Sequence, residues 1–92
     1  MAKKVDKNQR AIVQALRQCG YTVLHLHAVG RGCPDLMVGR DGVNYLIEVK
    51  SAKGKLTPQQ VTFFGHWQGQ VMIIRSVEEV MALAMGERAN NE

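Results

Sequence analysis

The chain has 92 residues, 46% of them hydrophobic, which fits a single globular domain over residues 1–92 and excludes a chain that is disordered as a whole. No apolar run approaches the roughly 20 residues of a membrane span, and the N-terminal MAKKVDKNQR lacks the apolar core of a signal peptide. The net charge is +4, and residues 1–77 carry eleven Lys and Arg against four Asp and Glu. That bias is typical of nucleic-acid binders, although solubility alone would also explain it.

The cysteine content argues against a disulfide scaffold and against a zinc site. Cys19 and Cys33 are far apart and do not form a Cys-x-x-Cys pair. Without an export signal, reduced thiols in the cytoplasm of a bacterial or phage-infected cell are the expectation.

The first element expected is an amphipathic helix over residues 6–18, followed by Gly20 as its stop signal. Its apolar residues recur at helical spacing, at Ile12, Ala15, Leu16 and Cys19. Gln9 lies on an overlapping stripe, so it is placed at the inward edge of the first turns. Asp6 is expected to be solvated at the start of the helix.

Residues 21–27, YTVLHLH, predict a strand rich in β-branched, aromatic and apolar side chains. His25 and His27 share one face of it, but a pair of this kind in a strand is more often ordinary surface or core than a metal site. The next residues, VGRGCP, form a loop whose two glycines permit close backbone approach. Arg31 in this loop is positioned to contact a phosphate.

Residues 35–50, DLMVGRDGVNYLIEVK, predict a β-hairpin. Asp41-Gly42 between two apolar runs indicates a type I′ turn, which needs positive φ at both central residues. With these two residues as the turn, Asp35 lies directly opposite Glu48, at a Cβ separation of about 4.5–5.5 Å. Lys50 projects from the same face, because it follows Glu48 by two residues.

Two facing carboxylates are unfavourable in a structural sheet, but they suit a divalent cation such as Mg²⁺, which prefers carboxylate oxygens. An Asp–Lys–Glu cluster of ion pairs is the structural alternative. The other face of the hairpin is apolar and consists of Leu36, Val38, Tyr45, Ile47 and Val49. Met37 and Leu46 on the charged face indicate that this face is also partly covered, so the charged cluster is expected in a cleft.

After the hairpin, SAKGKL is a basic loop that places Lys53 and Lys55 where they could neutralise phosphates. TPQQ then predicts a helix start, with Thr57 as N-cap and Gln60 closing a capping box. Gln60 also heads a stripe toward the protein interior. A capping role, a site role and a combination of the two are therefore all open for this residue.

The helix that begins here is expected to end at Gly69. Phe64 and Trp67 continue the inward stripe from Gln60, and Phe63 lies off it as a candidate for an exposed apolar contact.

Residues 70–75, QVMIIR, predict a strand whose continuous apolar middle suits burial on both faces. Ser76 and Glu79 form a second capping box. It opens a helix with one face made of Val77, Val80, Met81 and Ala84. Residues 1–5 and 86–92 are expected to be loose tails, and the whole order is αβββαβα in a mixed α/β chain.

Two motifs resemble a known family. Pro34-Asp35, followed at a hairpin's length by Glu48-Val49-Lys50, is similar to the signature of the PD-(D/E)xK nuclease superfamily. More narrowly, GRGCPDLMVG followed by LIEVKSAKGKLTPQQ resembles the small stand-alone VRR-NUC nucleases that are common in phages and prophages. The similarity runs from about residue 8 to residue 80.

The resemblance implies a restriction-endonuclease-like fold, with an αβββαβα core and a mixed central sheet. It implies that Asp35, Glu48 and the backbone carbonyl of Val49 bind Mg²⁺ or Mn²⁺, and that Lys50 and Gln60 complete the catalytic set. In this family the first helix often adds an acidic residue near the site. Besides Asp6, the first helix of this chain offers only the amide Gln9 for that position.

We therefore expect a metal-dependent DNA endonuclease that hydrolyses phosphodiester bonds in branched DNA, such as four-way junctions or flaps. Lys50 would orient or deprotonate the attacking water, and Arg31, Lys53 and Lys55 would contact DNA. A homodimer is expected because the core is small and because stand-alone relatives imply it. The alternative is a non-catalytic DNA-binding module with a nuclease-like fold, although the sequence identifies no aromatic stacking positions for single strands.

Overall fold

The computed structural model describes residues 7–91. Its elements follow in the order α1 (Lys7–Gln18), β1 (Thr22–His25), β2 (Leu36–Arg40), β3 (Val43–Val49), α2 (Pro58–His66), β4 (Val71–Ile74) and α3 (Val77–Asn91). The predicted αβββαβα order is confirmed. Residues 1–5 and Asp6, for which the sequence predicts a loose tail and a solvated carboxylate, lie outside the described residues. Within residues 7–91 no helix has the length and apolar character needed to cross a membrane.

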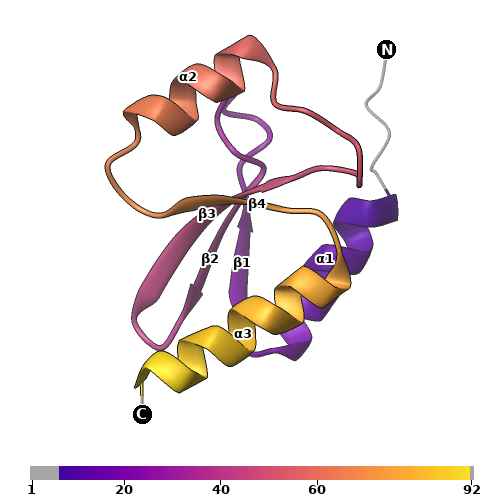
Figure 1. Ribbon diagram of the computed structural model, residues 1–92, viewed down its shortest axis with the longest axis vertical. Helices are drawn as coiled ribbons and strands as arrows, with labels where there is room; N and C mark the ends of the chain where they lie inside the picture. The colour runs from indigo at the N-terminus through magenta and orange to yellow at the C-terminus, as the bar shows by residue number, and fades with distance from the viewer. Residues whose placement is uncertain (1–6, 92) are drawn as a thin grey trace.

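The four strands form one sheet in the order β1-β2-β3-β4. The first three strands are antiparallel and β4 runs parallel to β3, so the sheet is mixed, as predicted. α1 packs against β1, β3 and α3. Figure 1 shows α1 and α3 together at one end of the molecule and α2 at the other.

The hydrophobic core lies between the α1–α3 pair and the apolar face of the hairpin formed by β2 and β3. Its completely buried members are Ile12, Leu16, Leu36, Val38, Ile47 and Val80. Each such side chain contributes about 1.5–3 kcal/mol when removed from water. Because this face of the hairpin is fixed against the helices, the alternate side chains, including Glu48, must point to the other side of the sheet.

The hairpin has the predicted turn and register. Asp41 and Gly42 have φ values of 55° and 80°, as a type I′ turn requires. Arg40 pairs with Val43 and Leu36 pairs with Ile47. Continuing this ladder by one position brings Asp35 opposite Glu48.

Arg40 ties the tip of the hairpin to both helices of the core. Its guanidinium donates to the carbonyl oxygens of Cys19 (3.0 Å) and Ala84 (2.7 Å), and lies 4.7 Å from the centroid of the Tyr21 ring. These contacts hold the turn against the end of α1 and the middle of α3, so they reinforce the register at the turn end of the hairpin.

β4 is less buried than its apolar sequence predicts. Val71, Met72 and Ile73 are half-buried, and only Ile74 is buried. The reason is position in the sheet: β4 is the last strand, so one of its edges has no neighbouring strand.

The aromatic residues of α2 do not pack as predicted. α2 ends at His66, before Gly69, and none of its residues is buried. Trp67 is 46% exposed and stacks on Phe63, with ring centroids 5.2 Å apart. The helical period places Trp67 on an inward stripe and Phe63 outside it, but a helix that makes few contacts with the core has no strongly defined inward face.

α3 begins as predicted and ends later. Glu79 N donates to Ser76 Oγ (3.2 Å), while Glu79 Oε1 accepts from Arg75 N (2.6 Å), one residue further back than a capping box requires. The helix continues to Asn91, so the prediction of a loose tail is wrong for residues 86–91. One Gly in a helix costs only about 1 kcal/mol, and the helix formers that follow it sustain the helix.

On the predicted apolar face of α3, two of the four side chains are buried. Val80 and Ala84 are in the core, whereas Val77 is 38% and Met81 is 49% exposed. The buried side of α3 is therefore narrower than the sequence stripe.

The loop between β1 and β2 packs against the first turn of α2. Gly30, Arg31 and Gly32 have φ values of 76°, 58° and 80°. A Cβ atom at Gly32 would lie 2.5 Å from the carbonyl oxygen of Gln59, whereas one at Gly30 would meet nothing within 4 Å. Only at Gly32, therefore, does close packing add to the backbone requirement.

This difference predicts unequal effects of two matched substitutions. Gly30→Ala should lower the free energy of unfolding by about 1–2 kcal/mol, the cost of a left-handed non-glycine residue. Gly32→Ala should cost roughly 1–3 kcal/mol more, because α2 or the loop must move. Urea denaturation of both variants measures the difference, and equal losses would contradict the loop–helix contact.

Candidate active site

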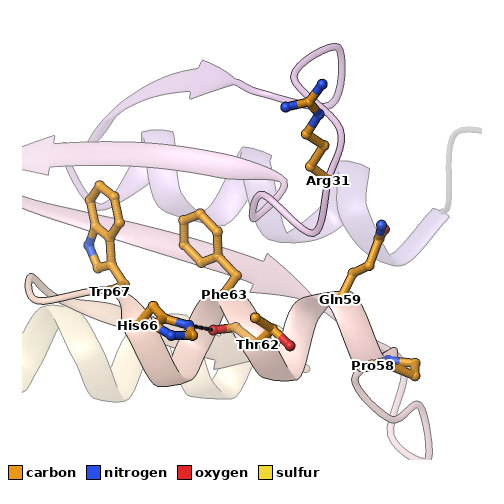
Figure 2. A pocket seen from close by; sticks show the side chains of 7 residues that line it. All are labelled: Arg31, Pro58, Gln59, Thr62, Phe63, His66 and Trp67. Carbon is orange, nitrogen blue, oxygen red and sulfur yellow. Dashed lines mark hydrogen bonds between the residues drawn. The ribbon is translucent and has the colours of Figure 1, made fainter.

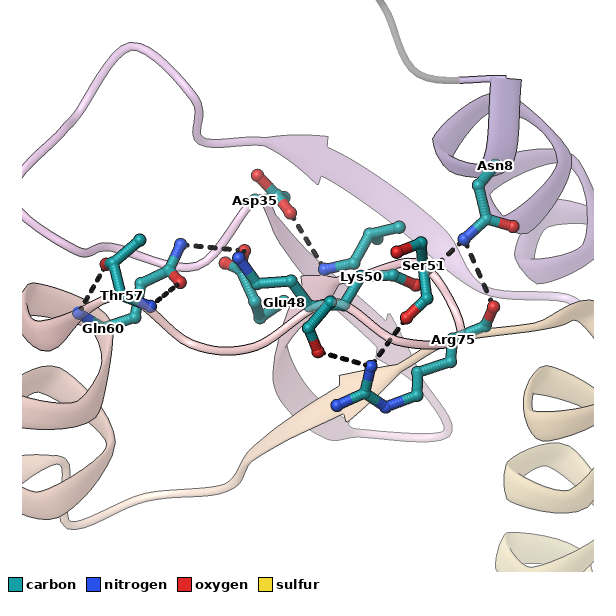
Figure 3. A network of polar contacts seen from close by, with 10 residues as sticks. Asn8, Asp35, Glu48, Lys50, Ser51, Thr57, Gln60 and Arg75 are labelled. Atoms are coloured by element: carbon teal, nitrogen blue, oxygen red, sulfur yellow. Dashed lines mark hydrogen bonds and ion pairs between the residues drawn. The ribbon is translucent and has the colours of Figure 1, made fainter.

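Two carboxylates and one ammonium meet where β2 begins and β3 ends. Asp35 immediately precedes β2, and its Oδ2 accepts a hydrogen bond from Val49 N (2.9 Å). Glu48 belongs to β3 and is 3% exposed. Lys50 Nζ lies 3.5 Å from Glu48 Oε2 (Figure 3). The structure thus brings together the three charged residues that the sequence register selects.

Gln60 links this cluster to α2 with both halves of its amide. Its Oε1 accepts from Thr57 N (2.9 Å) and its backbone N–H donates to Thr57 Oγ1 (3.2 Å), which is a complete capping box. Its Nε2 donates to Glu48 Oε2 (2.9 Å). Of the roles left open by the sequence, Gln60 therefore combines the cap with a direct contact to the carboxylate pair.

Glu48 is an unusual carboxylate, because its pKa is raised to about 7. Burial is the largest cause, and the negative charge of Asp35 is the second; Lys50 partly offsets both. The same surroundings, burial first and then the two carboxylates, raise the pKa of the nearby Cys33 thiol. The cluster therefore holds an excess of negative charge that its one ammonium does not neutralise.

The oxygen atoms of this cluster fit a divalent cation. Glu48 Oε1 is buried and has no hydrogen-bond partner within the described part of the chain, whereas Oε2 contacts Lys50 and Gln60. A cation would satisfy that oxygen and compensate the charge that raises the pKa of Glu48. Residues 7–91 contain no group of three or more His, Cys, Asp and Glu side chains that could form a complete ligand set. Two carboxylates completed by water or main-chain oxygens suit Mg²⁺ or Mn²⁺, since Mg²⁺ usually keeps several waters.

The first helix reaches the site through Asn8 rather than through Gln9. Asn8 Nδ2 donates to the carbonyl oxygens of Lys50 (3.0 Å) and Arg75 (3.2 Å), and so joins the ends of β3 and β4. Gln9 is half-buried, and no contact found within residues 7–91 joins it to Asp35 or Glu48. The helical period does not decide between adjacent residues at the first turn, so the sequence carried no signal for Asn8.

A second residue that the sequence did not identify is Arg75, which holds the basic loop after β3. Its Nη1 donates to the carbonyl oxygens of Ser51 (2.6 Å) and Gly54 (2.7 Å). Lys53 and Lys55, the predicted DNA contacts, are exposed on this loop. Arg75 therefore fixes the backbone that carries two exposed cations beside the carboxylates.

The remaining predicted positions fall into two groups. Arg31 is exposed on the loop that leads to Asp35. Val49 contributes its N–H to Asp35, and its carbonyl oxygen as a metal ligand stays a prediction. His25 and His27 are exposed, with ring centroids 6.5 Å apart, and belong to no metal cluster in the described residues.

Comparisons with known proteins agree with this geometry. The family model described as archaeal Holliday junction resolvase (Hjc) matches residues 1–67, which include the whole carboxylate cluster and Gln60. A solved structure described as a VRR_NUC domain superimposes with a TM-score of 0.73 and 28% sequence identity, covering 91% of this chain and 97% of that one. A search of curated proteins found no match.

Gln60→Glu should separate the two functions of this side chain. Glutamate keeps the acceptor that caps α2, but it replaces the donor to Glu48 with an oxygen of a third carboxylate group. The added negative charge beside Glu48 should lower the melting temperature of the metal-free protein. Nuclease activity should fall roughly 10–100-fold, as is usual for groups that orient metal-binding residues. Gln60→Ala is the control that loses the cap as well. An unchanged rate in Gln60→Glu would leave only the capping role.

The raised pKa of Glu48 predicts how stability depends on pH and on metal. Between its ordinary value of 4.5 and about 7, the folded protein keeps a proton that the unfolded chain releases. Stability of the metal-free protein should therefore fall as pH rises through this window and level off above it, by about 3 kcal/mol at most. Mg²⁺ should raise the melting temperature more at pH 8 than at pH 5.5.

Glu48→Gln is the matched variant for this experiment, because it keeps the shape of the side chain and removes its titration. Its stability should change less between pH 5.5 and pH 8, and it should gain less from Mg²⁺. Equal stabilisation of Glu48→Gln and wild type by Mg²⁺ would place the cation elsewhere.

Proposed function

Because the chain belongs to the archaeal Holliday junction resolvase (Hjc) family, as a nuclease of the VRR-NUC type, we propose that it is a Mg²⁺- or Mn²⁺-dependent endonuclease that cuts branched DNA. The observation that carries this proposal is the buried Glu48, which faces Asp35, has its pKa raised, and has one oxygen without a hydrogen-bond partner within residues 7–91. Four-way junctions and flaps are the proposed substrates. The cell cytoplasm, where such DNA occurs, is the proposed location.

Each residue of the cluster has a part in the proposed reaction. Asp35 and Glu48, with the carbonyl of Val49, would hold the cation, which when bound supplies a Lewis acid for the phosphate. Gln60 and Lys50 both contact Glu48 Oε2, so they fix the orientation of that carboxylate. Lys50 Nζ, at the edge of the cluster, would orient the attacking water and neutralise charge that develops on the phosphate.

Asn8 and Arg75 support this arrangement from outside it. Asn8 holds the backbone of Lys50 and therefore the direction of its side chain. Arg75 holds the loop that carries Lys53 and Lys55, which we propose to contact the phosphates on either side of the cut. Arg31 is the proposed contact on the opposite loop.

We further propose that the protein acts as a two-fold symmetric homodimer. A 92-residue chain buries proportionately little surface, and α3 carries an exposed apolar stripe of Val77, Met81 and Met85. This stripe replaces Phe63 as the proposed contact, since Phe63 packs on Trp67. Two copies related by two-fold symmetry would present two cutting sites to a junction that has the same symmetry.

The second candidate is a DNA-binding module without catalysis. Such a module would use the same basic loops to bind DNA, but it would not cleave it. The set of Asp35, Glu48, Lys50 and Gln60 favours the enzyme, because a binding module has no need of a buried carboxylate, Glu48, that faces a second one, Asp35.

The central prediction is metal-dependent cleavage. Labelled duplex, flap and four-way-junction DNA should be cut with Mg²⁺ and remain intact with EDTA. Asp35→Ala, Glu48→Ala and Lys50→Ala should each slow cleavage about 100-fold or more, while some DNA affinity remains. Wild-type cutting by Lys50→Ala would refute the assignment of the site, and binding without any cutting by the wild type would favour the second candidate.

The control for this experiment is the pair Lys53→Ala and Lys55→Ala, which changes charge outside the cluster. It should weaken binding and flatten the dependence of log affinity on log salt by about 0.9 per lost phosphate contact. At low salt its cleavage rate should approach that of the wild type.

The dimer is tested by the mass in solution. Light scattering at micromolar concentration should give twice the chain mass of 10.2 kDa. Met85→Glu places a charge on the most exposed residue of the α3 stripe and should shift the mass to one chain, whereas Val61→Glu on α2 should not. A wild-type mass of one chain would remove the dimer and leave a flap- or nick-directed monomer.

A further inference from the structure

An open groove of about 530 Å³ runs along the side of α2, from Pro58 and Gln59 at its first turn to Trp67. The stacked rings of Phe63 and Trp67 form one wall, with their planes 15° apart. Arg31, on the loop between β1 and β2, lines the other side of the groove (Figure 2). The groove thus combines a flat aromatic surface with one cation.

The fold itself gives no use for these two rings. α2 contributes no buried residue to the core, and Trp67 leaves 46% of its surface in water. Arg31 is held in the left-handed region at φ 58°, where a non-glycine residue is strained. Exposed aromatic surface beside a strained, exposed arginine is more consistent with a binding site than with a structural role.

We propose that this groove binds an unpaired DNA base near the cleaved phosphate, with the base stacked on the exposed face of Trp67, which Phe63 backs from the other side, and its phosphate paired with Arg31. The inference rests on the proposed nuclease function and adds the class of DNA that the site selects. Stacking on aromatic side chains and pairing with arginine are the two interactions by which proteins hold single-stranded nucleotides. The sequence alone identifies no stacking position, because the arrangement of Phe63 and Trp67 appears only in the structure.

Groove and active site share the same two segments of the chain. Gln59 lines the groove, and the next residue, Gln60, donates to Glu48. Arg31 stands at the other wall, on the loop that continues through Gly32 to Asp35. A nucleotide in the groove would therefore be next to the phosphate at the carboxylates, and splayed DNA would be favoured over fully paired duplex.

A second copy of this chain is the competing occupant of an apolar groove. Charge favours the nucleotide, because the cation at the rim of the groove is repelled by the same cation of a symmetric partner and attracted by a phosphate. The exposed α3 stripe offers the copy another surface.

Trp67 is the only tryptophan of the chain, so its fluorescence reports on the groove alone. The wild-type protein in EDTA is titrated with duplexes that carry a short single-stranded flap and with fully paired duplexes of the same length. Stacking should quench the emission strongly with the flapped DNA and little with the duplex. Gel analysis of the same samples checks that the DNA stays intact.

Variants measure what the rings contribute to binding. Trp67→Ala should weaken binding of flapped DNA about tenfold or more, and change duplex binding less than twofold. Trp67→Phe should recover part of the affinity. Val61→Ala, on the opposite side of the same helix, should bind both DNAs as the wild type does. Arg31→Asn removes the cation, and asparagine tolerates the left-handed backbone. This variant should weaken the binding of flapped DNA more than the binding of duplex DNA.

The outcomes separate this inference from the proposed function. Cleavage in Mg²⁺ without selective quenching would overturn the proposal of base binding in the groove and leave the nuclease function standing. Selective quenching without cleavage would overturn the nuclease function and leave base binding in the groove standing. Equal loss of flapped and duplex binding in Trp67→Ala would also overturn the groove. So would a Trp67 emission that shifts with protein concentration and not with DNA, because it would assign the groove to a second copy.

Discussion

The structure depends on one local constraint, the register of the hairpin that joins β2 to β3. Side chains alternate across a strand, so a shift by one residue would turn Asp35, Glu48 and Lys50 toward the core and expose Leu36, Val38 and Ile47. The Asp41-Gly42 turn sets the register at one end. Arg40 locks the same end onto α1 and α3, and the burial of the apolar face excludes the alternative. The carboxylate pair is therefore a consequence of packing on the other face of the sheet.

Because the sheet register places Asp35 opposite Glu48, the neighbouring residues must compensate the negative charge of these two carboxylates. Like charges opposite each other destabilise a sheet, and burial makes the charged form of Glu48 still less favourable. Lys50 and Gln60 stabilise one oxygen of Glu48 and leave the other without a partner among the residues that the structure describes. A protein selected for stability alone would place apolar side chains here, so the retained cost is the physical argument for a cation-binding function.

The sequence predicted what local chemistry determines. The order of the elements, the turn, the register and the cap formed by Thr57 and Gln60 follow from residues that are close along the chain, and each is confirmed. The contacts of Asn8 and Arg75 join residues distant in the chain, and no local pattern encodes them. The predicted burial of β4 and of α2 is wrong for a related reason. An apolar run shows that a segment tends to be buried, but it does not show which other elements of the fold are in place to cover it.

The position of α2 links the active site to the groove on its side. With no buried residue, this helix gains little from the core, and its orientation rests on a few contacts at its first turn. One is the close approach of Gly32 to Gln59, and another is the hydrogen bond from Gln60 to Glu48. The first contact involves the loop that carries Arg31 and Asp35, and the second involves β3, which carries Glu48. A ligand that fixes α2 from the groove would therefore also fix the donor to Glu48, so binding of the correct DNA and orientation of the carboxylate become one event.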